Sequence, residues 1–321
     1  MGGSDSAQWE ATDNWPFKWP PLLVDKLREL GLPRLETPDL WVASDYSGAQ
    51  RGSRFMMIGV LIGDAGHSAE WELRRRKIRK QHLPDSRRMS FKGLNDSKRR
   101  AALIPFLNAA DAIRGISFVV AVDRRLRNFG GHKDLQQRMK ELGVVSGSWK
   151  PHTFDRMIVQ THLISILLSL LTREGQSITW ISDADDSFAT EAHKKDTAGM
   201  MGRFCSLYIR HRLGRLSVGT TDLDEGDRFE EDFAAIPDLA AGAVGELFEK
   251  TCMELGKIPS IASLAPQSLS RKANLITSSF FRPNTKHVKI SCVIQKISEG
   301  HLQISTIWEG DRFGSSMVST I

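Results

Sequence analysis

The sequence has little cysteine: only Cys205, Cys252 and Cys292 occur in 321 residues. They are widely spaced and form no CxxC pair or Cys/His cluster, so neither a disulfide framework nor a zinc site is indicated. No apolar run reaches the length of a membrane span, and the N-terminal residues lack the basic and then apolar pattern of a secretory signal. We therefore expect a cytoplasmic protein that does not bind membranes.

Several common catalytic motifs are missing as well. The chain has no GxSxG motif, no P-loop and no dinucleotide-binding glycine pattern, which leaves the corresponding chemistries without support. The composition, 40% hydrophobic and 26% charged, is that of an ordinary globular protein. A chain of this length can bury a sizeable core in one large domain or two small ones.

Positive charge is concentrated in one region. The net charge is only +6, but twelve of the 44 Lys and Arg residues lie between Arg74 and Arg100. Such a run attracts polyanions, although it can also be a solvated helix face or supply partners for acidic residues elsewhere. We predict that it binds the nucleic-acid backbone, through Arg74, Arg75, Arg76, Lys77, Arg79, Lys80, Arg87 and Arg88.

Strand and helix patterns alternate along the chain. Two strands near 40–48 and 54–64 suit a hairpin, and further strands are expected near 115–123, 177–183 and 215–221. Helices are expected near 71–82, 97–113, 152–172, 190–213 and 229–256, the last broken at Pro237. This alternation predicts an α/β fold with a mixed sheet flanked by helices. We expect an N-terminal arm at 1–38, a main domain at 39–256 and a C-terminal extension at 257–321 that carries a β-hairpin.

Three aspartates stand at the ends of successive elements. Asp45 leaves the first strand, Asp183 leaves a later one, and Asp238 follows Pro237 at the expected start of a small-residue helix. Each also has an ordinary structural explanation: a turn cap, a helix cap or a favourable charge at a helix N-terminus. Together they predict a carboxylate cage for Mg²⁺ or Mn²⁺, with Asp186 as a further candidate ligand.

The order of strand-Asp, hairpin, central helix, strand-Asp and helix-Asp resembles the ribonuclease H-like (retroviral integrase) superfamily. Within it, the chain looks like the family called domain of unknown function 3800. The residues that carry the resemblance are Ala43-Ser44-Asp45-Tyr46-Ser47-Gly48 and Pro237-Asp238-Leu239-Ala240-Ala241-Gly242. The resemblance implies an RNase H-like sheet and catalytic roles for Asp45, Asp183 and Asp238, with Lys92 at the position of the family's lysine.

Two family glutamates are missing from this pattern. Tyr46 and Ser90 stand in their places, and Glu72 or Asp96 are the nearby acids that would have to substitute. The favoured hypothesis is a metal-dependent nuclease of RNase H-like type that acts on DNA or RNA. The alternatives are a catalytically inactive nucleic-acid-binding protein, or an interaction subunit that meets a protein partner through the arm with Trp9, Trp15 and Trp19.

Overall fold

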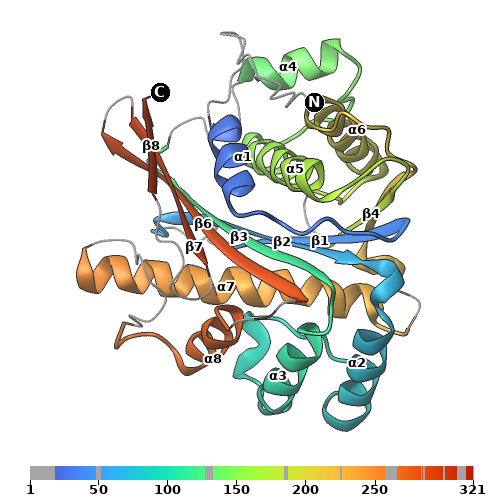
Figure 1. Cartoon of the computed structure of the whole chain (residues 1–321), viewed down its shortest axis with the longest axis vertical. Helices are drawn as coiled ribbons and strands as arrows, with labels where there is room; N and C mark the ends of the chain where they lie inside the picture. The colour runs from blue at the N-terminus through green and yellow to red at the C-terminus, as the bar shows by residue number, and fades with distance from the viewer. Residues whose placement is uncertain are drawn as a thin grey trace, which may run out of the picture.

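The core of the protein is one mixed β-sheet (Figure 1). The computed structural model describes residues 19–47, 52–126, 133–183, 187–224, 226–256, 266–282, 284, 286–298, 301–308 and 316–320. The strands follow the order β5-β4-β1-β2-β3-β6-β7-β8. Their bounds are β1 Asp39–Ser47, β2 Phe55–Asp64, β3 Gly115–Asp123, β4 Ser177–Ser182, β5 Leu216–Thr220, β6 His287–Ser298, β7 His301–Trp308 and β8 Ser316–Thr320. β1, β2 and β3 form an antiparallel meander, while β4 and β5 run parallel to β1 and β6 runs parallel to β3.

Helices cover both faces of the sheet. In Figure 1, α1, α5 and α6 lie above it, and α7, α8, α2 and α3 lie below. Their bounds are α1 Trp19–Glu29, α2 Ala69–His82, α3 Ser97–Ala110, α4 Lys133–Glu141, α5 Pro151–Leu171, α6 Glu191–Tyr208, α7 Phe229–Leu255 and α8 Arg271–Phe280. Short 3₁₀ turns occur at η1 Ala65–His67, η2 Lys92–Asn95 and η3 Thr221–Leu223. This is the helix-flanked mixed sheet that the sequence predicts.

The two faces of the sheet bury different side chains, because neighbouring residues of a strand point to opposite sides. On β1, Leu40 and Val42 belong to the core shared with α5, whereas Ala43 belongs to the core shared with α7. β3 is buried along its whole length, which explains its continuous apolar sequence. Residues of odd number on β1, Asp45 among them, therefore point toward the α7 side.

α7 corrects one prediction. The helix runs unbroken from Phe229 to Leu255 with Pro237 inside it, so Asp238 lies within the helix rather than at its start. An internal proline removes one backbone hydrogen bond and costs about 3 kcal/mol. The long buried face of α7, from Phe233 to Phe248, offsets this cost by packing on the sheet.

The C-terminal hairpin is part of the central sheet. β6 pairs with β3 and β7 pairs with β6, as predicted for a hairpin near residues 287–310, and both strands extend the main sheet. α8 packs beside α7. The segment 257–321 therefore shares one sheet with 39–256.

The described part of the N-terminal arm packs on the domain through α1, whose Trp19, Leu23 and Leu27 are buried in the core shared with α5. Trp9 and Trp15 lie outside the described residues.

α5 is long and apolar enough to cross a membrane by length and composition, in contrast to our reading of the sequence. In the structure, 83% of its apolar window is buried inside the protein. α5 is thus the core helix of the upper layer.

A candidate active site of clustered carboxylates

Two neighbouring parallel strands bring Asp45 and Asp183 together. Ser44 of β1 is paired with Ser182 of β4, so the next residue on each strand is one of the two aspartates. Neighbouring strands lie about 4.8 Å apart, and residues in register on parallel strands point to the same face. Asp45 and Asp183 therefore stand side by side on the α7 face.

A close approach between β2 and α7 supplies the third carboxylate. Gly59 of β2 is the partner of Asp45 across the β1–β2 ladder. A Cβ atom at Gly59 would lie only 2.5 Å from the carbonyl oxygen of Pro237, so glycine is what lets α7 lie this close to the sheet. Asp238, one residue along the helix, is thereby held next to Asp45.

The three aspartates line one cavity of about 700 Å³. Three cationic side chains, Arg88, Lys92 and Lys272, line it too. Lys92 is exposed on η2, and Lys272 comes from α8. The cavity thus combines acidic groups suited to a hard cation with basic groups suited to a phosphate.

Each carboxylate is held by hydrogen bonds. Asp183 Oδ1 accepts from Arg88 Nη1 at 2.5 Å and from Thr221 Oγ1 at 3.1 Å. Asp238 Oδ2 accepts from the backbone N–H of Phe91 at 2.8 Å. The charge of Asp238 acts on Asp45, and Arg88 supplies a positive charge to both.

The protonation of this pair differs from that of free aspartate. Burial raises the pKa of Asp45 well above its usual range, and the negative charges of Asp238 and Asp183 raise it further. Burial also raises the pKa of Asp238, against the hydrogen bond from Phe91. Burial opposes the charge on Arg88, but its bond to Asp183 raises the pKa of Arg88 overall. Without a further cation, Asp45 and Asp238 therefore hold a proton more tightly than a free aspartate does.

Oxygen donors of this kind fit Mg²⁺ or Mn²⁺ by their chemistry. In the described part of the chain, however, no three His, Cys, Asp or Glu side chains are already arranged to hold a metal ion. Arg88 and Thr221 both donate to Oδ1 of Asp183, so a metal ion at this carboxylate would share it with a positive charge. Asp186, our fourth candidate ligand, lies outside the described residues.

Tyr46 and Ser90, which stand where the resemblance in the sequence would place glutamates, make other contacts. The ring of Tyr46 lies 3.6 Å from the guanidinium carbon of Arg156, in a cation–π contact. Ser90 Oγ accepts a hydrogen bond from the N–H of Gly93. The two suggested substitutes are engaged elsewhere, since Glu72 pairs with Arg75 and Asp96 caps α3 by accepting from the Arg99 N–H.

Two glutamates that the sequence analysis missed do line the cavity. Glu246 and Glu249 lie on α7, at helical spacing from Asp238 and on the same face as Gly242. Glu246 accepts from Ser270 Oγ at 3.0 Å and Glu249 from the N–H of Phe55 at 3.0 Å. The spacing of the acids along α7 was the signal that would have found them.

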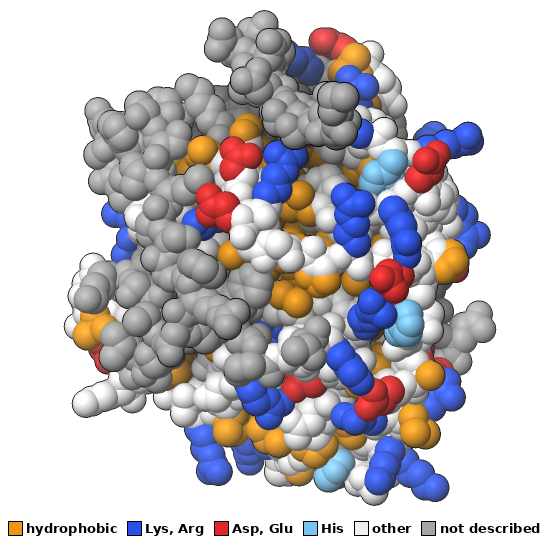
Figure 2. All heavy atoms as spheres, viewed as in Figure 1, with side chains coloured by type: hydrophobic (Ala, Val, Ile, Leu, Met, Phe, Trp, Pro, Cys, Tyr) orange, Lys and Arg blue, Asp and Glu red, His pale blue; other side chains and the backbone are white. Residues whose placement is uncertain are grey.

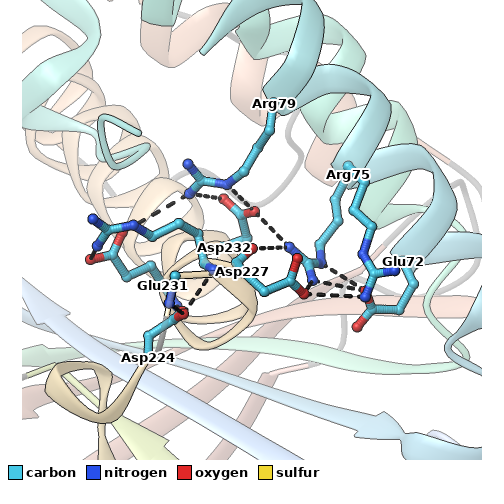
Figure 3. A network of polar contacts seen from close by, with 10 residues as sticks. Glu72, Arg75, Arg79, Asp224, Asp227, Glu231 and Asp232 are labelled. Atoms are coloured by element: carbon cyan, nitrogen blue, oxygen red, sulfur yellow. Dashed lines mark hydrogen bonds and ion pairs between the residues drawn. The ribbon is translucent and has the colours of Figure 1, made fainter. Parts of the chain in front are cut away.

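The basic segment does not form one surface. Arg75 has a fully buried side chain and pairs with Glu72, Asp227 and Asp232 (Figure 3). Arg79 donates two bonds of 2.7 Å to Asp232. These arginines join α2 to the start of α7, and the full burial of Arg75 is contrary to our expectation that its side chain contacts nucleic acid. Arg75 and Arg79 instead fit the alternative interpretation of the basic run, in which its residues pair with acidic residues elsewhere in the chain.

The remaining basic residues have different surroundings. Arg87 pairs with Asp85 and Asp96, whereas Arg88 lies in the carboxylate cavity. Figure 2 shows Lys and Arg side chains spread over one face of the molecule with acidic side chains between them. Four members of the predicted set are exposed, and their role stays a prediction: Arg74, Arg76, Lys77 and Lys80.

Comparison with known proteins adds little. No family model and no curated protein sequence matches this chain. Among solved structures, it is similar to the crystal structure of the ribonuclease H2 from Pyrococcus horikoshii OT3, with 14% identity and a TM-score of 0.32 over 74% of this chain and 97% of that chain. So low a TM-score carries no argument about this protein. The sheet topology by itself is consistent with the RNase H-like fold that we predicted.

Proposed function

We propose that this protein is a divalent-metal-dependent nuclease of RNase H-like type, related to the family called domain of unknown function 3800. The observation that supports it most is that Asp45 of β1, Asp183 directly after β4 and Asp238 of α7 line a single cavity with three cationic side chains. Carboxylates and cations in one cavity suit a reaction that needs both a metal ion and a bound phosphodiester.

The proposed roles follow from position. Asp45, Asp183 and Asp238 would hold Mg²⁺ or Mn²⁺, which lowers the pKa of water and neutralises charge on the leaving oxygen. Arg88, Lys92 and Lys272 would contact the scissile phosphate from the other walls of the cavity. In the reaction, a water oxygen forms a bond to phosphorus, the bond to the leaving oxygen breaks, and that oxygen takes up a proton.

A second candidate is a nucleic-acid-binding protein without turnover. It is favoured by the ion pair between Arg88 and Asp183 and by Tyr46 and Ser90 in place of the family's glutamates. An intramolecular cation at this position stabilises the carboxylates in the way that a metal ion would.

Cleavage assays on purified protein separate the two. Wild type and Asp45→Asn are compared with Mg²⁺ and Mn²⁺ on single-stranded, duplex and hybrid substrates. We expect metal-dependent cleavage by the wild type that Asp45→Asn abolishes, because the amide keeps the shape but loses the charge that holds the ion.

The matched control is Asp39→Asn, an exposed position at the other end of β1, which should keep full activity. An inactive wild type across all substrates and both metals defeats the nuclease proposal. Equal activity in wild type and Asp45→Asn keeps an enzyme but removes Asp45 from its centre.

A further inference from the structure

A second cavity lies between the C-terminal half of α2 and the segment that leads into α7. It encloses about 390 Å³. Four cationic side chains and one acidic side chain line it: Arg76, Arg79, Lys80, Arg228 and Asp227. The wall therefore has an excess of positive charge, and we refer to it as the basic pocket.

Two arginines of the basic pocket carry spare hydrogen-bond donors. Arg79 binds Asp232 through Nε and Nη2, while its Nη1 is buried with no hydrogen-bond partner among the described residues. Arg228 donates from Nη1 to Glu231 at 2.6 Å, and its Nε is buried and equally unsatisfied within the described chain. A buried donor without a partner costs about 1–3 kcal/mol, which a bound anion would recover.

The acidic residues behind the pocket hold these arginines in place. Figure 3 shows Asp232 between Arg79 and Arg75, and Glu231 on the other side of Arg79. Burial raises the pKa of Asp232, opposed by its bonds to Arg79 and Arg75. Each guanidinium is thereby oriented by an acid and keeps one nitrogen without a partner among the described residues.

The backbone around the basic pocket is strained. Ser86, with φ of 58°, and Arg228, with φ of 59°, are the non-glycine residues with positive φ in the described part of the chain. Both line the pocket. Such conformations cost about 1–3 kcal/mol each and cluster at ligand-binding sites, so their occurrence here agrees with a binding role.

We propose that the basic pocket binds a phosphate group. Guanidinium groups bind carboxylate and phosphate oxygens alike, but a phosphate offers more acceptor oxygens than a carboxylate to the four cationic side chains that line this pocket. Ser86 lines this pocket and Arg88 lines the carboxylate cavity, so at most about 7 Å of backbone separates the two walls. If the proposed nuclease function holds, a strand with its scissile phosphate in the carboxylate cavity has a neighbouring phosphate in the basic pocket.

Charge reversal at one lining residue tests the proposal. Lys80 is exposed in the pocket, and Lys195 is exposed on α6, on the other side of the sheet in Figure 1, so Lys80→Glu and Lys195→Glu change the net charge equally. Binding of labelled single-stranded and duplex oligonucleotides is measured by fluorescence anisotropy in EDTA, where cleavage plays no part. We expect Lys80→Glu to weaken binding roughly tenfold and to reduce the slope of log K against log salt by about 1. Lys195→Glu should weaken binding less than about twofold.

Competition identifies the source of the phosphate. If inorganic pyrophosphate displaces the oligonucleotide from the wild type but not from Lys80→Glu, the pocket is a site for free phosphate compounds. If pyrophosphate does not displace the oligonucleotide, and Lys80→Glu still binds the oligonucleotide more weakly, the pocket binds a phosphate of the strand. Equal losses in the two variants, or no binding of oligonucleotide or pyrophosphate by the wild type, overturn the proposal. This experiment measures binding and not cleavage, so its outcome does not depend on whether Asp45→Asn abolishes cleavage.

Discussion

Gly59 of β2 lies beneath the carbonyl of Pro237 on α7, so closely that a Cβ atom would be 2.5 Å from that oxygen. The obstacle is backbone, which cannot rotate away as a side chain can. We therefore expect Gly59→Ala to push α7 from the sheet and to destabilise the protein by about 1–3 kcal/mol, measured by urea denaturation. Because Asp238 moves with Pro237, any affinity for Mn²⁺ should fall as well.

Gly202→Ala is the matched control for this change. Gly202 lies in α6, and a Cβ atom there would have nothing within 4 Å. The same substitution should stabilise the protein by up to about 1 kcal/mol, since alanine is the better helix former. A Gly59→Ala protein as stable as the wild type would show that the helix is not held at this distance.

Arg88 pairs with Asp183 in the cavity where we propose that a metal ion binds. Replacing it with glutamine removes a positive charge from three carboxylates, and charges about 4 Å apart interact by roughly 4 kcal/mol at an effective dielectric constant of 20. We expect Arg88→Gln to bind Mn²⁺ at least about threefold more tightly, as measured by isothermal titration calorimetry. This gain in affinity corresponds to a modest part of that interaction energy. Arg87→Gln, whose side chain pairs with Asp85 and Asp96 outside the cavity, should leave the affinity unchanged. Weaker binding by Arg88→Gln would place the metal elsewhere.

Two adjacent arginines of α2 should differ sharply in their effect on stability. Removing Arg75 leaves Asp232 buried with one partner fewer, and breaking a buried pair typically costs about 3 kcal/mol. Arg74 has a side chain that is 48% exposed and pairs with Glu70 one turn away, a contact worth at most about 0.5 kcal/mol. Urea denaturation of Arg75→Ala and Arg74→Ala measures the difference. Equal losses would mean that the network in Figure 3 does not hold α2 to α7.

Much of the fold could be predicted because its signals are local. The continuous apolar run of β3 follows from its burial on both faces of the sheet, and the expected helix near 97–113 begins where Asp96 caps α3. The prediction of a break at Pro237 was wrong because the packing of α7 on the sheet is a tertiary effect. Propensity alone cannot weigh that packing.

The candidate site was predictable only in part. The sequence indicated the three aspartates, and the structure places all three at one cavity, although Asp45 lies within β1 and Asp238 within α7 rather than at the ends of these elements. It did not indicate Lys272, which reaches the cavity from α8 and donates to the carbonyl of Phe91 at 3.1 Å. Nor could the charge run show that Arg75 is buried, because its partner Asp232 lies more than 150 residues away.

The stability of the metal-free protein should depend on pH through Asp45. Its pKa is raised by folding, so the folded state binds the proton more tightly than the unfolded chain, whose Asp pKa is about 3.9. The stability that Asp45 contributes is fully present when the pH is below the pKa of the unfolded chain. It is lost as the pH rises through the pKa of the folded state. Relative to wild type, Asp45→Asn should therefore gain stability as the pH increases from about 4 to 7.

Asp123, at the end of β3, gives a control of opposite sign. Burial works against its charge, but hydrogen bonds from Arg125 hold the pKa of Asp123 below its usual range. Its stabilising effect is present above about pH 4 and is lost as the pH falls, so Asp123→Asn should be less stable than wild type at pH 7 and approach it in acid. Thermal melting of the three proteins in EDTA across this range measures both trends. If Asp45→Asn and Asp123→Asn shift in the same direction with pH, then Asp45 is not held in a repulsive carboxylate cluster.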